Sequence, residues 1–376
     1  MGLAPGPFEM TRTQVEMGHS LTVFCGAHPS GRREPVPGAR VLVVPRAVKG
    51  ILLFTSAPAL LIRFLWYQSR HPVDVIHGHA HVTQWFNLWR LAFGGKCPYF
   101  YHMHVTFAGR EKAMLARGHR YTAIERFSNR VGKICDAWGA RAADHIFVTN
   151  ESVKEEAVSL IGVPPDRITV IKNGVNTSLF RPAPKDPALL ARLGLGPAPG
   201  DTVVLYAGVL NQRKNIGALL EALARLPDGF KLILAGDGPA EYIRDLKERA
   251  RGLGIGERVA FAGYVAYPEL PPYYYACDLF VLPSLYEGMP KVLLESLASG
   301  KPSIIHSGYG LDAGLEPFVD KADCTDAAAL AACMARAAER GFKGDHADFL
   351  EKFSWRSIMD RMDGVYARFL PGKLRA

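Results

Sequence analysis

The sequence predicts an α/β protein of two doubly wound domains, in which helices cover parallel sheets. Three observations support this prediction. The chain has 376 residues, more than one ordinary core accommodates, so two domains of roughly 150–200 residues are expected. Short apolar runs alternate with helical stretches along both halves. Hydrophobic residues make up 48% of the chain and charged residues 22%, a balance that argues against global disorder.

The first domain is predicted at residues 1–178. Its strand-like runs are apolar, and several end at small or polar residues, as strands that lead into loops do. These runs are residues 21–24, 41–44, 73–77, 99–102 and 145–148. Helices are expected at 57–68 and, in a long basic stretch, at 121–141.

The beginning of the chain departs from the pattern of such a domain, which normally opens with an apolar strand, a glycine-containing turn and a helix. The sequence begins at what looks like the turn, residues 4–7, and a short helix then reaches Gly18 and His19. The first strand is therefore expected to be missing, through truncation or a misassigned start codon. On this interpretation Gly6 lies in an N-terminal loop near the ligands.

The second domain is predicted at residues 179–353, after a proline-containing join at 176–186. Its expected strands are residues 203–206, 231–235, 259–261, 279–282 and 302–305. The segments between them have helical spacing at 216–225, 242–251 and 292–299.

Positive charge is concentrated in the first half. Residues 1–178 hold 21 Lys and Arg against 12 Asp and Glu, whereas residues 179–376 hold 24 of each, which accounts for the net charge of +9. This asymmetry predicts an anionic partner for the first domain, such as an acidic membrane surface or a phosphorylated acceptor. The alternative is a basic surface that is merely solvated.

Two segments of the first half are candidates for peripheral contact with an anionic membrane: the helix at 57–68 and the basic stretch beyond Gly109. The basic residues of that stretch are Arg110, Lys112, Arg117, Arg120, Arg126, Arg130 and Lys133. An ordinary core helix and a solvated face explain the pattern equally well. The longest apolar run, residues 51–66, is too short and too interrupted for a spanning helix.

The cysteines and the first residues favour a cytoplasmic protein. The six cysteines form no CxxC pair and no histidine-rich ligand spacing, which favours buried, reduced thiols over disulfides or a zinc site. Residues 1–7 lack the basic start and the apolar run of a signal peptide.

The stretch 279–300, LFVLPSLYEGMPKVLLESLASG, holds the densest set of candidate binding residues. A buried strand leads through a loop to a helix that begins near Pro290. Backbone N–H groups at the start of a helix favour an anion. The residues expected around this anion site are Gly288, Met289, Lys291 and Val292.

Two glutamates, Glu287 and Glu295, flank the predicted anion site eight residues apart. Carboxylates accept hydrogen bonds from vicinal hydroxyls, such as those of a sugar or a ribose. The pair therefore predicts binding of the two ends of a sugar nucleotide. The alternative is that both are solvated charges on the helix surface.

A second candidate segment, residues 206–215, ends a strand at Gly208 and places Arg213 and Lys214 before a helix. A forked guanidinium and a mobile ammonium suit a pyrophosphate. On its own, such a pair is more often plain surface.

Four histidines collect at predicted strand ends, where ligands bind in open α/β sheets. They are His77 and His79 in DVIHGH, and His102 and His104 in YHMHVT. A catalytic position is plausible there, although a lone histidine is more often structural. Their spacing could also suggest metal binding, but no metal is expected.

These segments, in this order, resemble those of the retaining GT-B glycosyltransferases of family 4, the glycosyl transferases group 1. The resemblance covers nearly the whole chain and is carried by GHSLTVF, DVIHGH, YAGVLNQRKNI, LILAGDGP and ACDLFVLPSLYEGMPKVLLESLASGKPSII. It implies the GT-B fold, with two facing Rossmann-like domains and a donor site in the cleft between them. FSWRSIMDRMDGVYARFL resembles the terminal helix of such proteins, so residues 354–371 are expected to pack on the first domain.

The resemblance also implies a role for each matching residue. Glu287 would bind hydroxyls of the donor sugar and Glu295 the ribose. Arg213 and Lys214 would stabilise the diphosphate leaving group without a metal. His104 would lie near the donor sugar and position it or stabilise developing positive charge. The leaving phosphate is thought to take the acceptor's proton.

Base recognition in this architecture relies on backbone groups, here near Gly263 and Val265, so the sequence leaves the base open. The chain also departs from the family pattern in two places. Val209 stands where members commonly have arginine, and the segment after Ile305 lacks the usual Gly-Gly-x-x-Glu turn. Both departures affect the predicted binding of the donor.

The leading hypothesis is an enzyme that moves a hexose from a nucleotide-diphosphate sugar to an acceptor, with retention, in cell-envelope, polysaccharide or glycolipid synthesis. A GT-B nucleotide-sugar epimerase and a non-catalytic or truncated donor-binding homologue are the alternatives. No cofactor is expected besides the donor substrate. Nucleic-acid binding is disfavoured, because the basic residues lack aromatic interleaving.

Overall fold

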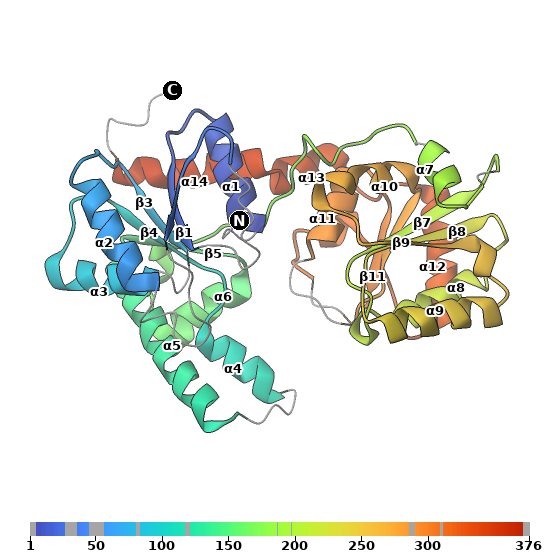
Figure 1. The fold of residues 1–376 in the computed structure, drawn as a ribbon, viewed down its shortest axis with the longest axis horizontal. Helices are drawn as coiled ribbons and strands as arrows, with labels where there is room; N and C mark the ends of the chain where they lie inside the picture. Colours follow the sequence, from blue (N-terminus) through green and yellow to red (C-terminus); the bar gives the residue numbers. More distant parts are fainter. Residues whose placement is uncertain are drawn as a thin grey trace. The chain divides into compact units, whose positions relative to one another are not determined.

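The computed structural model describes residues 5–26, 36–44, 56–79, 83–116, 121–185, 187–196, 198–285, 290–308 and 311–370. The chain divides into two compact units (Figure 1). Unit 1 comprises Met1–Asn173 and Trp355–Ala376, and unit 2 comprises Gly174–Ser354. Unit 1 is therefore discontinuous in sequence, because its last helix follows unit 2.

Unit 2 contains a six-stranded parallel sheet with the order β12-β11-β10-β7-β8-β9. Its strands are β7 (Thr202–Ala207), β8 (Phe230–Ala235), β9 (Val259–Gly263), β10 (Leu279–Leu282), β11 (Ser303–His306) and β12 (Asp320–Ala322). The chain adds strands on one side of β7 up to β9, then returns to the other side at β10. The reversal makes β7 and β10 the switch point of a doubly wound sheet.

Helices lie on both sides of this sheet (Figure 1). One side carries α8 (Ile216–Leu223), α9 (Ala240–Gly252) and α12 (Ala327–Arg340), and the other carries α7 (Pro187–Arg192), α10 (Pro271–Ala276), α11 (Lys291–Ala298) and α13 (His346–Phe353). The strands between them are buried, which explains why they read as continuous apolar runs.

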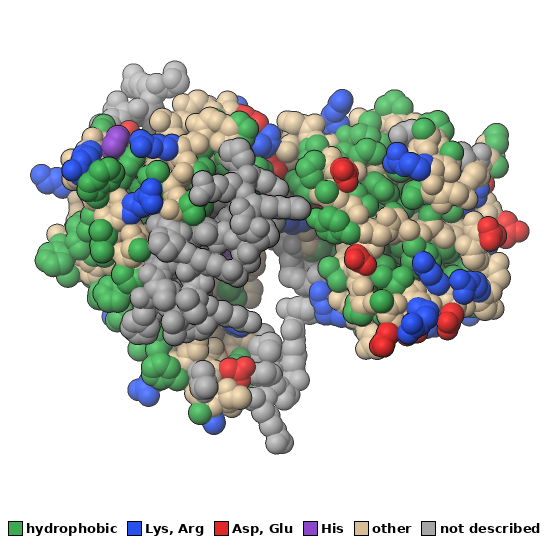
Figure 2. Space-filling model, viewed as in Figure 1, with side chains coloured by type: hydrophobic (Ala, Val, Ile, Leu, Met, Phe, Trp, Pro, Cys, Tyr) green, Lys and Arg blue, Asp and Glu red, His purple; other side chains and the backbone are tan. Residues whose placement is uncertain are grey.

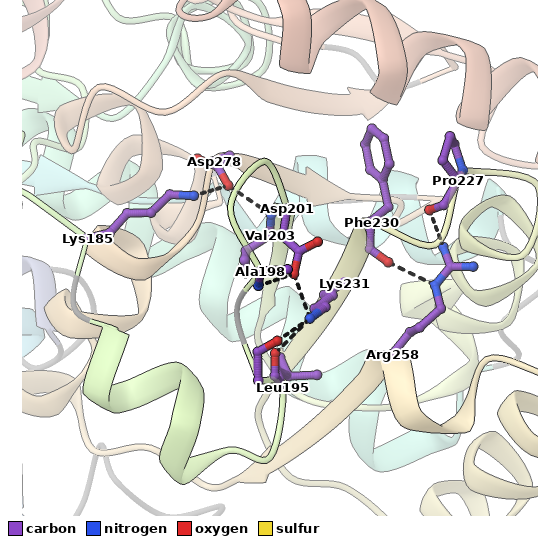
Figure 3. Close-up of polar contacts among 11 residues, drawn as sticks. Lys185, Leu195, Ala198, Asp201, Val203, Pro227, Phe230, Lys231, Arg258 and Asp278 are labelled. Carbon is purple, nitrogen blue, oxygen red and sulfur yellow. Dashed lines mark hydrogen bonds and ion pairs between the residues drawn. The ribbon is translucent and has the colours of Figure 1, made fainter.

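Charged side chains form hydrogen bonds and ion pairs at the amino ends of these strands (Figure 3). Asp278, just before β10, accepts hydrogen bonds from the N–H of Val203 at 2.8 Å and from Nζ of Lys185 at 2.5 Å. Asp201, just before β7, contacts Nζ of Lys231 at 2.6 Å, and this contact lowers the pKa of Asp201. The contacts stabilise the strand starts and leave the carboxyl ends of the strands for a ligand.

The described strands of unit 1 form two parallel sheets, β1-β2 and β3-β4-β5-β6. They are β1 (Thr22–Gly26), β2 (Arg40–Val44), β3 (Ile76–His79), β4 (Tyr99–Met103), β5 (His145–Val148) and β6 (Ile168–Val170).

The helices of unit 1 are α1 (Pro5–Glu16), α2 (Ser56–Gln68), α3 (Gln84–Phe93), α4 (Phe107–Ala116), α5 (Ala123–Ala142), α6 (Glu151–Glu156) and α14 (Trp355–Phe369). Helix α14 packs Ile358 and Met362 onto Phe100 of β4 and Phe147 of β5. Helix α1 lies beside α14 (Figure 1). The last helix of the chain thus contributes to the core of unit 1.

The ten predicted strands are present, with ends that shift by at most three residues. The largest shift is in β3, predicted at 73–77 and observed at Ile76–His79. The strands β6 and β12 were not predicted, because each has three residues and β12 contains Asp320 and Lys321. In the described part of the chain, none of the helices is long and apolar enough to cross a membrane.

The prediction that Gly6 lies in a loop was wrong, because Gly6 lies in the first turn of α1. Pro5 and Pro7 suit this turn, since proline lacks the N–H that has no helical acceptor there. A Cβ at Gly6 would lie 3.6 Å from Oδ1 of Asn173, an ordinary contact. Nothing in this geometry requires glycine.

Candidate functional site

Six of the predicted donor-binding residues of unit 2 follow the two strands of the switch point. They are Gly208, Arg213 and Lys214 after β7, and Lys291, Val292 and Glu295 after β10. The N–H of Leu285 donates a hydrogen bond to the carbonyl O of Arg213 at 3.3 Å, which joins the two loops. The structure therefore brings both segments to one edge of the sheet, where ligands of open α/β sheets bind.

The loop after β7 carries its two cations on a single 3-10 turn, Gln212–Lys214. Asn215 follows in the left-handed conformation at φ 54°, and its side-chain amide donates to the carbonyl O of Cys324 at 2.7 Å. These contacts fix the turn directly before α8. Arg213 and Lys214 thus stand at the N-terminus of a helix, where negative charge is favoured.

Close backbone contacts connect the ends of β7, β8 and β9. The N–H of Gly208 donates to the carbonyl O of Ala235 at 2.9 Å, and the N–H of Gly236 to that of Gly263 at 2.8 Å. A Cβ at Gly236 would lie 1.8 Å from the carbonyl O of Gly208, so only glycine fits there. Gly263 has a φ of 70°, and Val265 packs partly buried against the core.

Three predicted residues after β10, Glu287, Gly288 and Met289, lie outside the described residues. The description resumes at Pro290, and α11 begins at Lys291. Lys291 and Val292 therefore occupy the first turn of α11, as predicted. The first N–H groups of a helix lack intrahelical acceptors and can turn to a ligand.

Glu295 is buried, with only 4% of its surface exposed, so the alternative of a solvated surface charge is excluded for it. The O–H of Tyr274 in α10 donates to the Glu295 carboxylate at 2.9 Å. Burial, together with the charge of Glu295, raises the pKa of Tyr274 well above its usual value, so this phenol stays protonated. Tyr274 was not predicted as a site residue, because it stands in a run of three tyrosines that nothing in the sequence pattern distinguishes.

The parallel register of β3 and β4 brings the four histidines of unit 1 together. His79 lies opposite His102 in the pairing of the two strands. The rings of His77, His79, His102 and His104 form a stack with neighbouring centroids 4.5–5.4 Å apart. Nδ1 of His79 lies 3.1 Å from Nε2 of His104, and Nδ1 of His77 lies 2.7 Å from the hydroxyl of Tyr366 in α14.

Burial keeps these four histidines uncharged. It lowers the pKa of His77 to about 3, and those of His79 and His102 well below the usual value. The neighbouring imidazoles lower these three values further. Burial also lowers the pKa of His104. At neutral pH the cluster consists of neutral rings, each with one N–H donor and one bare nitrogen.

Three of these rings are candidate metal ligands, because the ring nitrogens of His77, His79 and His102 lie within 4.8 Å of one another. Neutral imidazole is the form that binds a metal. The ring planes are nearly parallel, inclined by 6° to 23°. The rings would have to rotate before three lone pairs could point at one ion, so the observed arrangement is not a formed metal site.

A surface hollow of about 460 Å³ lies near the amino ends of β3 and β4, lined by residues that include His71, Lys96 and Phe369. None of the predicted binding residues lines it. It lies at the opposite end of the sheet from the histidines, because His79 and Met103 are the last residues of their strands.

Two family models match the chain. The model of Glycosyltransferase Family 4 matches residues 6–179, and that of Glycosyl transferases group 1 matches residues 201–340. Together they account for most of both units.

Individual relatives give the same result. An uncharacterized glycosyltransferase of Methanocaldococcus jannaschii is 29% identical over 63% of this chain, and the match spans 58% of the relative's own length, less than two thirds. The D-inositol 3-phosphate glycosyltransferase of Xylanimonas cellulosilytica is 29% identical over 81% of this chain and 74% of its own length. The solved structure of HepE from Anabaena, in complex with UDP and glucose, has the same fold with a TM-score of 0.67 at 20% identity, and covers 98% of this chain and 97% of that chain.

Proposed function

The chain belongs to the GT-B glycosyltransferases of family 4 and group 1, and from this premise we propose that it transfers a hexose from a nucleotide-diphosphate sugar to an acceptor. The observation that carries the proposal is the switch point of unit 2. There the hydrogen bond from Leu285 to Arg213 joins the two predicted anion-binding loops, and Glu295 is buried beside Tyr274. HepE, which shares the fold, binds UDP and glucose.

In the proposed reaction the diphosphate is the leaving group. Arg213 and Lys214 neutralise the charge that develops on it, together with the N–H groups of Lys291 and Val292 in the first turn of α11 and those of Gly288 and Met289 before it in the sequence. No metal is needed for this stabilisation, because two cations and a helix N-terminus supply the positive potential. The leaving phosphate takes the proton of the acceptor hydroxyl.

The remaining residues position the donor. Glu295 binds the hydroxyls of the ribose, and Glu287 binds those of the hexose. Backbone groups near Gly263 and Val265 recognise the base. His104 of unit 1 positions the sugar as the glycosidic bond breaks, and we propose that transfer proceeds with retention.

The acceptor is proposed to be anionic and bound by unit 1. This unit holds the whole excess of positive charge in the sequence. The D-inositol 3-phosphate glycosyltransferase relative acts, by its name, on a phosphorylated acceptor. A phosphorylated or lipid-linked acceptor suits cell-envelope, polysaccharide or glycolipid synthesis on the cytoplasmic side of the membrane.

The surface of unit 1 suits peripheral contact with an anionic membrane. Helix α5 exposes Arg126 and Arg130 beside Phe127, which is 70% exposed. Helix α2 exposes Ile62 and Trp66. Figure 2 shows hydrophobic side chains interspersed with Lys and Arg over the region of α2 and α3. Apolar side chains beside cations are the chemistry that binds an anionic interface.

The donor proposal is tested by thermal stabilisation of the full chain with a panel of nucleoside diphosphates and nucleotide sugars. A ligand that binds only the folded state raises the melting temperature. We expect one nucleotide family to do so, and expect Lys214→Ala and Glu295→Ala to remove the shift. The matched control is Arg251→Ala, which removes an exposed cation at the end of α9. Absence of a shift with every nucleotide contradicts the proposal.

Two further measurements separate the alternatives. Product analysis with the stabilising donor distinguishes transfer from epimerisation, and binding without turnover of any kind indicates a non-catalytic homologue. Treatment with EDTA is expected to leave transfer unchanged.

Membrane contact is tested by sedimentation with vesicles. We expect the protein to sediment with phosphatidylglycerol vesicles but not with phosphatidylcholine vesicles. Phe127→Ser should weaken this binding, whereas Leu253→Ser in unit 2 should not.

A further inference from the structure

The contact between His79 and His104 constrains both rings. Their nearest nitrogens, Nδ1 of His79 and Nε2 of His104, are 3.1 Å apart, the distance of an N–H to N hydrogen bond. One proton lies between them, so one nitrogen donates and the other accepts. The protonation of either ring therefore determines that of the other.

Two neutral states satisfy this contact. If Nδ1 of His79 carries the proton, Nε2 of His104 is bare and the second nitrogen of His104, its Nδ1, carries a proton. If Nε2 of His104 carries the proton, its Nδ1 is bare. In both states His79 occupies Nε2 of His104, which leaves only Nδ1 of His104 for a substrate.

The surroundings hold the pair in place. The His79 ring packs against those of His77, 4.5 Å away, and His102, 5.1 Å away, and these two rings are themselves 5.4 Å apart. Nδ1 of His77 in turn forms a hydrogen bond of 2.7 Å with the hydroxyl of Tyr366. The carbonyl O of His104 accepts a hydrogen bond from Oγ1 of Thr149 at 3.1 Å. Stacking on the His102 ring, 4.5 Å from that of His104 and 5.1 Å from that of His79, restricts rotation of both rings.

We propose that His79 is a positioning residue for the transfer reaction, which engages Nε2 of His104 and presents its Nδ1, in a single tautomer, to the bound sugar. This inference rests on the proposed function of His104 and adds the identity of the atom that meets the substrate. A partner that fixes the tautomer and the orientation of a histidine is a recurrent device at catalytic sites.

The kinetic test compares three replacements of His79. An Asn side chain places a polar atom near the position of Nδ1, a Gln side chain reaches the position of Nε2, and Leu offers neither. We expect His79→Asn to stay within a fewfold of the wild type, whereas His79→Gln and His79→Leu lower kcat about tenfold or more with the donor KM unchanged. In a His104→Ala background, His79→Leu should have no further effect, because the two residues act as a unit.

A structural readout needs no activity. We expect ¹⁵N spectra of the histidine rings in the full chain to show one protonated and one bare nitrogen on His104, kept in His79→Asn and averaged between tautomers in His79→Leu. Melting temperatures and nucleotide binding control for loss of the fold. An unchanged His104 spectrum in His79→Leu, equal rescue by Gln and Asn, or additive effects with His104→Ala would overturn the proposal. If no donor supports transfer, the proposed function fails, while the spectra still test whether His79 fixes the tautomer of His104.

Discussion

The carboxyl ends of the strands differ in kind between the two units. In unit 2 they are built from backbone groups, glycines and the cations Arg213 and Lys214. In unit 1 they carry the stack of four neutral histidines. Backbone donors and fixed charge suit the binding of an anion, whereas neutral rings suit the orientation of hydroxyls. If the proposed function holds, we expect affinity for the donor to reside mainly in unit 2 and orientation of the reacting groups in unit 1.

The largest expected effect tests whether the edge of unit 2 depends on backbone approach. Gly236→Ala places a methyl group 1.8 Å from the carbonyl O of Gly208, where no side chain can move aside. We expect a loss of about 4 kcal/mol or more in the free energy of unfolding, measured by denaturant titration. Gly78→Ala in unit 1 meets side-chain atoms of Tyr99 and Thr83 at 2.7 and 2.8 Å and should cost less. Gly252→Ala, with nothing within 4 Å, is the neutral control.

The second prediction tests whether unit 1 keeps its buried groups uncharged. Burial raises the pKa of Asp136 in α5 to about 6, with a smaller contribution from Glu156, while a hydrogen bond from the N–H of Phe107 opposes it. A carboxyl whose pKa is higher in the folded state destabilises the fold once it ionises. Stability should therefore fall as the pH rises from about 4 to about 6, by up to about 3 kcal/mol.

Asp136→Asn removes this titration and should flatten that part of the pH profile of unfolding. The measurement is the difference between the unfolding free energies of the variant and the wild type at pH 4 and pH 7, so that other titrating groups cancel. The same pH dependence in both proteins would contradict the assignment.

The third prediction separates orientation from affinity. His104→Ala should lower kcat about 100-fold, the usual range for a lost positioned side chain, and leave nucleotide binding to unit 2 unchanged. Lys214→Ala should weaken nucleotide binding directly. Calorimetric titration with the nucleoside diphosphate, beside steady-state kinetics, distinguishes the two. If His104→Ala abolishes nucleotide binding, the hypothesis that unit 2 alone provides the affinity for the nucleotide is wrong.

The smallest expected effect concerns Glu295. Tyr274→Phe removes the hydrogen bond of 2.9 Å to this buried carboxylate and leaves the packing of the ring. We expect the donor KM to rise about fivefold, equivalent to about 1 kcal/mol, with kcat nearly unchanged. Tyr275→Phe is the matched control, since its hydroxyl bonds to the carbonyl O of Leu179 instead.

Much of this fold was predictable because parallel strands buried on both faces leave a local signature. Residues 203–206 and 279–282 are apolar throughout and each follows a polar residue, Thr202 or Asp278, so both strands were predicted. β12 pairs with β11 although its sequence is polar, and only its neighbour in the sheet makes it a strand. A strand of this kind cannot be read from its own residues.

The candidate sites likewise contain residues that the sequence predicts and residues that only tertiary structure brings together. Arg213 and Lys214 were predicted because charge beside a helix start is visible in sequence, and Glu295 because of its spacing from Glu287. The partner of Glu295, Tyr274, depends on the packing of α10 near α11. The contact of His79 with His104 depends on the register of β3 and β4, which spans 25 residues of chain. Such pairings arise from tertiary structure.

Helix α14 supplies part of the core of unit 1 and follows unit 2 in the sequence. The ribosome makes it only after unit 2, about 180 residues later, which at about 5–20 residues per second takes on the order of 10–40 s. Until then Phe100 and Phe147 lack the apolar cover of Ile358 and Met362. Unit 2 is therefore complete first on the ribosome, and the nascent first unit is the part that a chaperone would meet.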